Sequence, residues 1–582
     1  MFKNISLFSL SLLMFLPTWV ESDAEDTPVN SITTPKWFYR DAPPKKSVRT
    51  KYSDFVFNGN EINVSLAFSN RSVPSTFYGA VVGLNETFPK TELLRQLPLS
   101  LVKIGGSDYS RFNWIDGILN PTIPATEETI ANPPRYFEKH LNVVEKVKIA
   151  RSMGADVILQ VNLLGYKPTV NPGGGGYTLS TVDTAKDAYA LVKYLNGEKK
   201  LNIKYFVMDN EPLIWSGTHW DLYPKPISAN LFLERFIKTV VAMRQAQKEI
   251  SGNAYDIKII GPEESQTWSW FQTFSEEDCV STNSATGEVK CYYNNSDQFE
   301  NFLEYFLYIL GKVEQGELAE LNPQKFRLID YFSIHAYPLF RSSYQDPDSF
   351  ITTPQGAQDI EGYLNAIALW NSDEANLYDQ VFPRRSINFF NWLNGKIQQH
   401  YPGLKLAVTE FGIDSGALID YHPLLRPLYN AEFMAIAIAN NVDIFNISYL
   451  NASSFNPNSW ALISEGHKTI PTFHSMSLMV RFYQGKLLQV STKYNSRDVN
   501  AKKLTAYATY SNDGFINLLT FNRSNEAVCA DLNFVKENQN REILGKCFPP
   551  LTMTILRIPI KKEAKNIDCY QYGQQELQVR SL

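Results

Sequence analysis

The chain has 582 residues, of which 44% are hydrophobic and 20% charged, and its formal net charge at pH 7 is -5. This composition excludes a disordered chain, and the length exceeds one ordinary domain and fits a barrel with an accessory domain. The charge is mild and no basic stripe is visible in the sequence, which argues against a protein that binds nucleic acid.

The N-terminus has the pattern of a signal peptide. Lys3 provides the positive charge, and the apolar run at 6–16 is too short to span a bilayer. Val20 and Ser22 are small residues at the spacing that signal peptidase requires, so we predict that residues 1–22 are removed. An uncleaved anchor is the alternative. We expect the mature protein to be secreted, extracellular or periplasmic, with no membrane partner.

Residues 23–75 begin as a polar segment with several prolines. Near 56–68 apolar and polar residues alternate as in a strand, and we expect this strand to join a β domain. From 76 to 478 the chain repeats a strand-then-helix rhythm. The eight β-type runs are Phe77–Val82, Leu99–Ile104, Val157–Leu163, Tyr205–Met208, Ile257–Ile260, Ile329–Ile334, Leu404–Val408 and Val442–Tyr449. Helical patterns include Tyr136–Met153, Thr184–Leu195, Ala229–Glu249, Phe299–Lys312, Ser386–His400 and Leu428–Asn440.

This rhythm predicts an α/β fold, a (β/α)8 TIM barrel, because parallel strands buried on both faces read as continuous apolar runs. The rival architecture is an open doubly wound sheet, which would need a glycine-rich phosphate turn after its first strand. The sequence has no such turn there. From 479 to 582, short β-type runs separated by turn signals predict a C-terminal all-β sandwich domain.

Five cysteines follow the signal segment, and their spacing fits no zinc pattern. In an oxidising compartment Cys279 and Cys291 would close one loop, and two of Cys529, Cys547 and Cys569 would pair. Five unpaired thiols are the alternative, because connectivity cannot be deduced from spacing alone.

Polar residues follow the predicted barrel strands at their carboxyl ends, where barrel enzymes place their active sites. Glu211 follows the fourth strand and Glu410 the seventh. Glycoside hydrolysis needs two carboxyl groups, one protonated to assist the leaving oxygen and one ionised to attack the anomeric carbon. A lone Glu after a strand would be a solvated loop residue, but this pair predicts a catalytic site. Asn210, beside Glu211, is suited to hydrogen-bond a sugar hydroxyl.

Further residues are expected to line the same cleft. His335 and Tyr337 follow the sixth strand, with a purely structural histidine as the alternative. Glu263 follows the fifth strand and is either a partner that sets the protonation of Glu211 or a simple loop acid. The tryptophans near the strand ends are candidate sugar platforms, although about half are expected to be core instead; they include Trp114, Trp215, Trp220, Trp268 and Trp460.

Five stretches of the chain resemble, in the same order, the motifs of one known family. They are 105–114, 209–219, 330–338, 369–370 and 401–410. Over roughly 76–478 the chain resembles glycoside hydrolase family 44, a group of retaining endo-β-1,4-glucanases and xyloglucanases, some also active on mannan or xylan. The resemblance implies a barrel plus a β-sandwich, with Glu211 as acid/base and Glu410 as nucleophile. It also implies that Arg111, Asn113, Trp215 and His219 lie at the substrate.

The chain departs from the family pattern at Ser107, where the family has Asn, at 411–414, and at 162–166, which lacks a Trp. We expect these departures to affect the choice of sugar. Alternatives to an internal cut in β-1,4-glucan or xyloglucan are therefore a hydrolase of mannan, xylan or a host polysaccharide, and a non-catalytic carbohydrate-binding barrel. No His/Asp cluster with metal-ligand spacing appears. We expect a monomer without a cofactor, while a structural calcium ion stays open.

Overall fold

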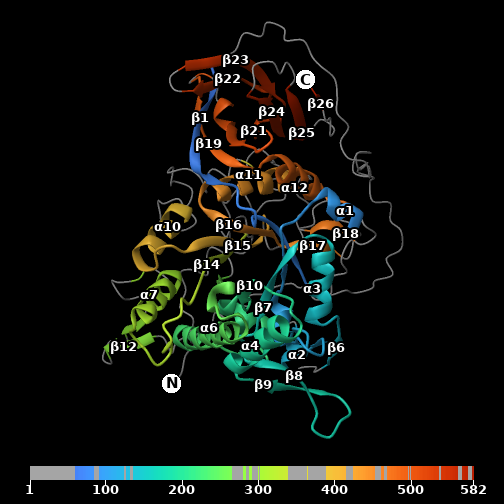
Figure 1. Cartoon of the computed structure of the whole chain (residues 1–582), viewed down its shortest axis with the longest axis vertical. Helices are drawn as coiled ribbons and strands as arrows, with labels where there is room; N and C mark the ends of the chain where they lie inside the picture. Colours follow the sequence, from blue (N-terminus) through green and yellow to red (C-terminus); the bar gives the residue numbers. More distant parts are fainter. Residues whose placement is uncertain are drawn as a thin grey trace, which may run out of the picture.

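The protein consists of a closed barrel surrounded by helices and a second domain built on a nine-stranded sheet (Figure 1). The computed structural model describes residues 59–83, 91–123, 126–131, 136–264, 279–283, 288–291, 299, 302–337, 364, 389–413, 424–452, 461–464, 468–495, 497, 500–536, 539–560, 567–573 and 580–581. The predicted signal peptide, its cleavage point near Ser22, and the candidate residues Trp268 and Trp460 lie outside these residues.

Eight parallel strands close the barrel, and each overlaps one of the eight predicted runs. In barrel order they are β10 (Tyr205–Met208), β11 (Lys258–Glu264), β14 (Tyr331–Ala336), β15 (Lys405–Phe411), β16 (Val442–Ile447), β2 (Tyr78–Val82), β3 (Leu101–Ile104) and β7 (Asp156–Val161). Nearly all of their residues are buried, as expected for parallel strands covered by helices. The predicted fold class is confirmed.

The interior of the barrel is apolar at one level and charged at the next. Its apolar layer consists of Leu101, Ile158, Tyr205, Val207, Ile260, Tyr331, Ala407 and Ile444. Alternate residues of a strand point to the same face. Lys103 therefore points into the barrel as Leu101 does, one level nearer the carboxyl end of β3. The fold thus places a lysine directly above a packed apolar floor.

Polar capping residues determine where two of the barrel helices begin. The helical pattern predicted from Tyr136 starts only at Val143 in α3 (Val143–Ser152), because Asn142 forms a capping box with Glu145. Helix α6 (Ala229–Ser251) is capped by Ser228. The other helices of eight or more residues within the described ranges are α4 (Thr184–Val192), α7 (Phe302–Gln315), α10 (Phe389–His400), α11 (Leu425–Ala439) and α12 (Pro471–Phe482).

Helices α11 and α12 lie between the barrel and the β domain (Figure 1). Every residue of α11 except the last, Ala439, is buried, including the charged residues Arg426 and Glu432. The carboxylate of Glu432 accepts hydrogen bonds from the Thr505 and Tyr507 hydroxyls and lies 3.8 Å from Arg523 Nε. Helix α11 is therefore a shared layer that joins the two domains.

The β domain is one curved sheet in the order β23-β22-β1-β19-β20-β21-β24-β25-β26. Its strands are β1 (Glu61–Ser72), β19 (Lys486–Lys493), β20 (Leu504–Tyr510), β21 (Phe515–Asn522), β22 (Val528–Lys536), β23 (Gln539–Phe548), β24 (Thr552–Pro559), β25 (Asp568–Gly573) and β26 (Arg580–Ser581). The N-terminal strand β1 pairs antiparallel with β19 and parallel with β22. Side chains from both halves of the sheet meet in one hydrophobic cluster, as the two layers of a sandwich do.

A disulfide joins Cys529 and Cys547 across β22 and β23, so the expected pairing among the C-terminal cysteines is confirmed. Cys569 is buried in β25. Cys279 and Cys291 are backbone partners in the hairpin of β12 (Cys279–Asn283) and β13 (Glu288–Cys291).

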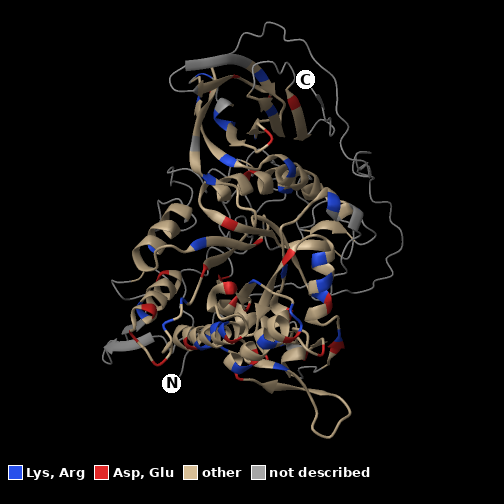
Figure 2. Cartoon of the chain, viewed as in Figure 1, with Lys and Arg blue, Asp and Glu red and all other residues tan. Residues whose placement is uncertain are grey.

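Acidic and basic residues are mixed over the outer helices of the described part of the chain (Figure 2). Within those same ranges, no helix combines the length and the apolar composition that crossing a bilayer would need.

Candidate active site

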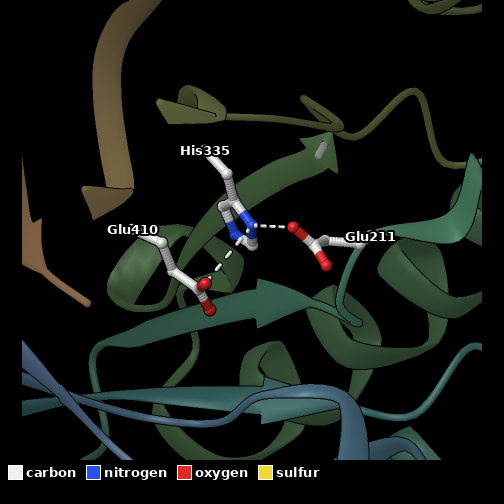
Figure 3. A group of neighbouring side chains, drawn as sticks. All are labelled: Glu211, His335 and Glu410. Carbon is white, nitrogen blue, oxygen red and sulfur yellow. Dashed lines mark hydrogen bonds and ion pairs between the residues drawn. The ribbon is translucent and has the colours of Figure 1, made fainter. Parts of the chain in front are cut away.

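Charged side chains from five neighbouring or facing strands meet at the carboxyl end of the barrel. Glu211 follows β10, Glu263 lies in β11, His335 in β14, Glu410 in β15 and Lys103 in β3. In Figure 3, Glu211 and Glu410 approach His335 from opposite sides. The structure therefore brings together the two carboxylates that the sequence predicted, with a histidine between them.

The His335 ring contacts three carboxylates. Its Nδ1 lies 2.8 Å from Glu211 Oε1 and 3.5 Å from Glu410 Oε2, and its Nε2 lies 3.0 Å from Glu263 Oε2. One oxygen of Glu211, one oxygen of Glu410 and one ring nitrogen all lie within 4.8 Å of one another. The two carboxyl groups thus face the same small space, which a single sugar-ring carbon and its oxygens could occupy.

Lys103 adds a second buried cation, which sequence analysis missed. Its Nζ donates to Glu263 Oε2 at 2.6 Å and to Glu410 Oε1 at 3.0 Å. The side chains of Lys103 and Glu263 are completely buried. The missed signal is a lysine inside an otherwise apolar strand, because lysine is almost never fully buried unless it is paired.

The hydroxyls of Tyr337 and Ser448 hold the other side of Glu410. Tyr337 Oη donates to Glu410 Oε2 at 2.9 Å, and Ser448 Oγ donates to Tyr337 Oη at 3.0 Å. Glu410 therefore accepts from Lys103 on one oxygen and from Tyr337 on the other. This pair of contacts fixes the plane of the carboxylate, and Ser448 is a further site residue that the sequence did not indicate.

The charges of this cluster set its protonation states. Burial alone would raise the pKa of Glu263, but Lys103 and His335 lower it to about 2. Burial would lower the pKa of His335, but the neighbouring carboxylates, Glu410 first, raise it to about 10. The same two cations outweigh burial at Glu410 and hold its pKa below the ordinary value. At neutral pH the site therefore contains an imidazolium, an ammonium and an ionised Glu410.

Glu211 is held by an unusual backbone. Asp209, Glu211 and Glu263 all have positive φ angles, of 65°, 45° and 63°. Such left-handed conformations are uncommon for residues other than glycine, and they cluster at functional sites, where the surrounding structure enforces them. Here the Glu211 N–H donates to the Glu263 carbonyl at 3.0 Å, and the buried Asp209 carboxylate accepts from the N–H of Leu164 at 2.8 Å.

Asn210 lies beside Glu211 with most of its surface covered. Its Nδ2 donates to Ser107 Oγ at 3.2 Å, and its buried Oδ1 has no hydrogen-bond partner among the described residues. Ser107 is one of the positions that depart from the family pattern. Because a buried polar atom without a partner is costly, Oδ1 is suited to accept a hydrogen bond from a bound molecule.

Three other predicted substrate contacts are buried within the protein. Arg111 is completely buried and forms a bidentate ion pair with Asp221, at 3.0 and 2.6 Å. Asn113 donates to Asp116 Oδ2 and to the Pro168 carbonyl. His219 is completely buried, and neither ring nitrogen has a partner within the described structure. These side chains are therefore already covered by protein in this structure.

Two expectations are corrected. Trp215 is 0% exposed, packs against Tyr223 and Phe232, and donates from Nε1 to the Asn210 carbonyl, so it is a core residue and not a sugar platform.

Phe411 was expected at the sugar but is also completely buried, with its ring stacked 4.4 Å from Phe433 of α11. Periodicity does not reveal which side of a strand end faces the cleft, because the chain leaves the regular alternation there.

Within the described part of the chain, one group could hold a metal ion: Glu211, His335 and Glu410, whose ligand atoms the fold brings together although the sequence shows no ligand spacing. A protonated imidazole offers no lone pair to a metal, and the raised pKa of His335 keeps the ring protonated at neutral pH. Lys103 Nζ also lies 3.3 Å from His335 Nε2 and would repel a cation. The cluster therefore fits a bound proton better than a metal ion.

The model of glycoside hydrolase family 44 matches residues 177–339, a segment that contains Glu211, Glu263 and His335. The resemblance to family 44 is confirmed. Glu410 and Lys103 lie outside the matched segment, and the barrel closure described above brings them to it.

Two curated relatives match parts of the chain. The β-mannanase/endoglucanase A of Caldicellulosiruptor saccharolyticus is 22% identical over 250 residues, which are 38% of this chain and 16% of the relative. Endoglucanase A of Paenibacillus lautus is 24% identical over 226 residues, which are 38% of this chain and 27% of the relative. The chain therefore matches only a minor part of either relative.

Solved structures of glycan-degrading enzymes, two of them from family 44, share the fold over most of the chain. A bifunctional glucanase-xylanase from a metagenome library superposes with a TM-score of 0.61 at 16% identity, covering 86% of this chain and 99% of its own. A family 44 endoglucanase from Clostridium thermocellum gives 0.58 at 17% identity, with coverage of 85% and 98%. A Paenibacillus polymyxa xyloglucanase with xyloglucan gives 0.56 at 15% identity, with coverage of 85% and 98%. Both domains of the chain therefore have counterparts in this family's architecture.

Proposed function

We propose that this protein is a retaining glycoside hydrolase that cuts internal β-1,4 linkages of a glucan or xyloglucan. Glu410 is the nucleophile and Glu211 the acid/base. The observation that carries the proposal is the closeness of the two carboxylates, which have oxygens within 4.8 Å of one another. Carboxyl groups about 5 to 5.5 Å apart are typical of retaining enzymes, whereas inverting enzymes separate them by roughly 6.5 to 9.5 Å to admit a water.

In the first step, one oxygen of Glu410 attacks the anomeric carbon and forms a glycosyl ester. The glycosidic C–O bond breaks, and Glu211 gives its proton to the departing oxygen. In the second step, Glu211 takes a proton from water, the resulting hydroxide attacks the anomeric carbon, and the ester bond to Glu410 breaks. The proton balance closes, because Glu211 is protonated again at the end of the cycle.

The surroundings of Glu410 favour both steps. A nucleophile must be ionised before attack, and Lys103 and His335 lower the pKa of Glu410. In the second step Glu410 is the leaving group, and the same two cations stabilise the carboxylate as it departs. Tyr337 fixes the carboxylate plane through its 2.9 Å contact, so the attacking oxygen is already oriented.

The substrate class is supported by the relatives. Their names indicate endoglucanase, β-mannanase, xylanase and xyloglucanase activities, which all act on β-linked backbones. The second candidate is a hydrolase of mannan, xylan or a host polysaccharide. It is favoured by Ser107, which departs from the family pattern and contacts Asn210 directly beside the acid/base. We also propose that the protein is secreted after cleavage near Ser22 and acts as a monomer on its polysaccharide.

A panel of soluble polymers tests the substrate class. Purified protein should lower the viscosity of xyloglucan or a soluble β-1,4-glucan quickly, while releasing few reducing ends, because internal cuts shorten chains early. Mannan and xylan test the second candidate under the same conditions. Glu410→Gln is the matched control, since it keeps the shape of the site and loses the nucleophile. Release of single sugars without loss of viscosity would contradict the internal cut and leave hydrolysis intact.

A further inference from the structure

The carboxylate of Glu263 is engaged from three directions and is 0% exposed. Thr409 Oγ1 donates to its Oε1 at 2.5 Å, while Lys103 Nζ at 2.6 Å and His335 Nε2 at 3.0 Å both approach its Oε2. Its backbone N–H lies 3.1 Å from Ser333 Oγ. Glu263 therefore lies out of reach of a sugar, and its influence on a reaction must pass through its neighbours.

The most direct of these neighbours is the His335 ring. An ionised carboxylate only accepts hydrogen bonds, so Nε2 must carry a proton toward Glu263. The ring is planar, so fixing Nε2 also fixes the direction of Nδ1. That atom lies 2.8 Å from Glu211 Oε1 and 3.5 Å from Glu410 Oε2. The orientation of one buried carboxylate thus determines where an N–H lies between the two proposed catalytic groups.

Glu263 also separates two cations. Lys103 Nζ lies only 3.3 Å from His335 Nε2, and Glu263 Oε2 accepts from both. Without that negative charge, an ammonium and an imidazolium at this distance would repel each other strongly in a buried site. Lys103 would retain Glu410 as a partner at 3.0 Å, so the expected response is loss of the Nε2 proton from His335.

We propose that Glu263 is a positioning residue that holds His335 doubly protonated, with its Nδ1–H directed at Glu211 and Glu410. The consequence for hydrolysis rests on the proposed function, whereas the effect on the His335 ring does not. Glu263 thereby links the acid/base to the nucleophile through one imidazole, and its backbone carbonyl, which accepts from the Glu211 N–H, supports the same arrangement.

Other charged and titratable groups face this ring from the elements around it. They are Lys103 in β3, Glu211 after β10, Glu264 in β11 and Glu410 in β15, and the hydroxyl of Tyr337, after β14, contacts Glu410. Burial raises the pKa of Glu264 well above its ordinary range. Glu264 is therefore harder to ionise than Glu263 and is a poorer counter-ion for His335.

The test compares two buried glutamates that share the same chemistry. Glu304 in α7 accepts from Lys396 Nζ at 2.7 Å and lies 3.0 Å from His400 Nε2, away from the barrel end. Glu263→Gln and Glu304→Gln each remove one buried carboxylate between a lysine and a histidine. The titration of His335 is followed by NMR of the imidazole nitrogens, with His335→Asn used to assign its signals. Hydrolysis of the best polymer from the panel is measured over the same pH range.

In Glu263→Gln, the His335 imidazole should titrate at a pH at least one unit lower than in the unmodified protein. We expect kcat to fall at least tenfold and its alkaline limb to move to lower pH, with KM changed less than threefold. Glu304→Gln should reduce thermal stability and leave the His335 titration and the pH profile unchanged. An unchanged His335 titration in folded Glu263→Gln would overturn the proposal.

If Glu263→Gln does not fold, Thr409→Val provides the second test. It removes one hydrogen bond to Glu263 Oε1 and preserves every charge. We expect a smaller fall in kcat with KM unchanged, because Glu263 is less firmly oriented. Unchanged kcat in folded Thr409→Val would then overturn the proposal. If the unmodified protein hydrolyses no glycan, the proposed function fails, while the His335 titration still decides the positioning role.

Discussion

At the scale of single residues, the site depends on an alternation of charge. Three carboxylates contact His335, and two of them also contact Lys103. Neither cation would be stable alone in the interior, since a buried unpaired charge is strongly unfavourable. The carboxylates and the cations therefore stabilise each other, and the same contacts keep Glu410, the proposed nucleophile, ionised.

Substrates with good and poor leaving groups can distinguish the proposed roles of the two glutamates. Glu211→Gln should slow polymer hydrolysis by about 10²–10⁴-fold, the usual contribution of a general acid. Activated aryl glycosides need no proton on the leaving group, so their first step should be spared. Added azide should then restore turnover and give a glycosyl azide of retained configuration, which NMR identifies. Glu410→Gln should be inactive on both substrates, and equal activity of the two variants on aryl glycosides would contradict these roles.

His335 also predicts a pH dependence of stability. Its pKa is raised in the folded state from 6.5 to about 10, so its favourable contribution is fully present below pH 6.5 and is lost as the pH rises toward 10. Glu263 behaves oppositely, because its pKa falls from 4.5 to about 2. Its contribution is present above pH 4.5 and is lost as the pH falls toward 2.

This dependence is measured by chemical unfolding of the unmodified protein and of His335→Asn at several pH values. The difference in the free energy of unfolding between the two should be largest near pH 6 and should shrink steadily up to pH 10. A difference that stays constant over this range would show that His335 is not charged in the folded protein.

At the scale of secondary-structure elements, the strand ends position the proposed catalytic groups. The order of the eight apolar runs was sufficient to predict that Glu211 and Glu410 meet, because consecutive barrel strands present their carboxyl ends on one face. Lys103 was missed, because its strand reads as apolar, and the charges that make its burial tolerable come from β11 and β15, far away in sequence. Such partners become visible only when the barrel is closed.

Trp215 shows a second limit of prediction from sequence. It follows a strand end within a matched motif, as a sugar platform would, yet the short turn after Pro212 directs it into the core against α6. Sequence alone did not distinguish these outcomes, because both place an aromatic residue within a few positions of Glu211. The difference lies in backbone angles at 209–211 that the residue types do not determine.

The corrected role of Trp215 leads to a different expected effect of mutation. Trp215→Ala should destabilise the protein by about 3–5 kcal/mol, the usual cost of removing a large buried aromatic. Since it also loses a hydrogen bond to Asn210, activity should fall equally on polymers and on short substrates. The partly exposed Trp220 is the matched control, and Trp220→Ala should cost less stability. A stable Trp215→Ala variant that loses only polymer hydrolysis would restore the platform role.

At the scale of the whole molecule, the β domain and the barrel share helix α11 and the contacts of Glu432. The N-terminal strand β1 crosses from one to the other, since it pairs with β19 and β22 while Arg71 forms an ion pair with Asp443 of β16. The change of rhythm near residue 478 predicted two domains, but it did not indicate this joint. Contacts between domains leave no periodic pattern of apolar residues in the sequence of either domain.

The central claim is double displacement between Glu211 and Glu410, and the configuration of the first product tests it most directly. Hydrolysis of a soluble β-1,4-linked oligosaccharide is followed by proton NMR during the first minutes, before the new reducing end equilibrates. The structure predicts that the β anomer appears first and the α anomer only later, by mutarotation. Initial formation of the α anomer would mean single displacement by water and would contradict the assignment of Glu410 as nucleophile.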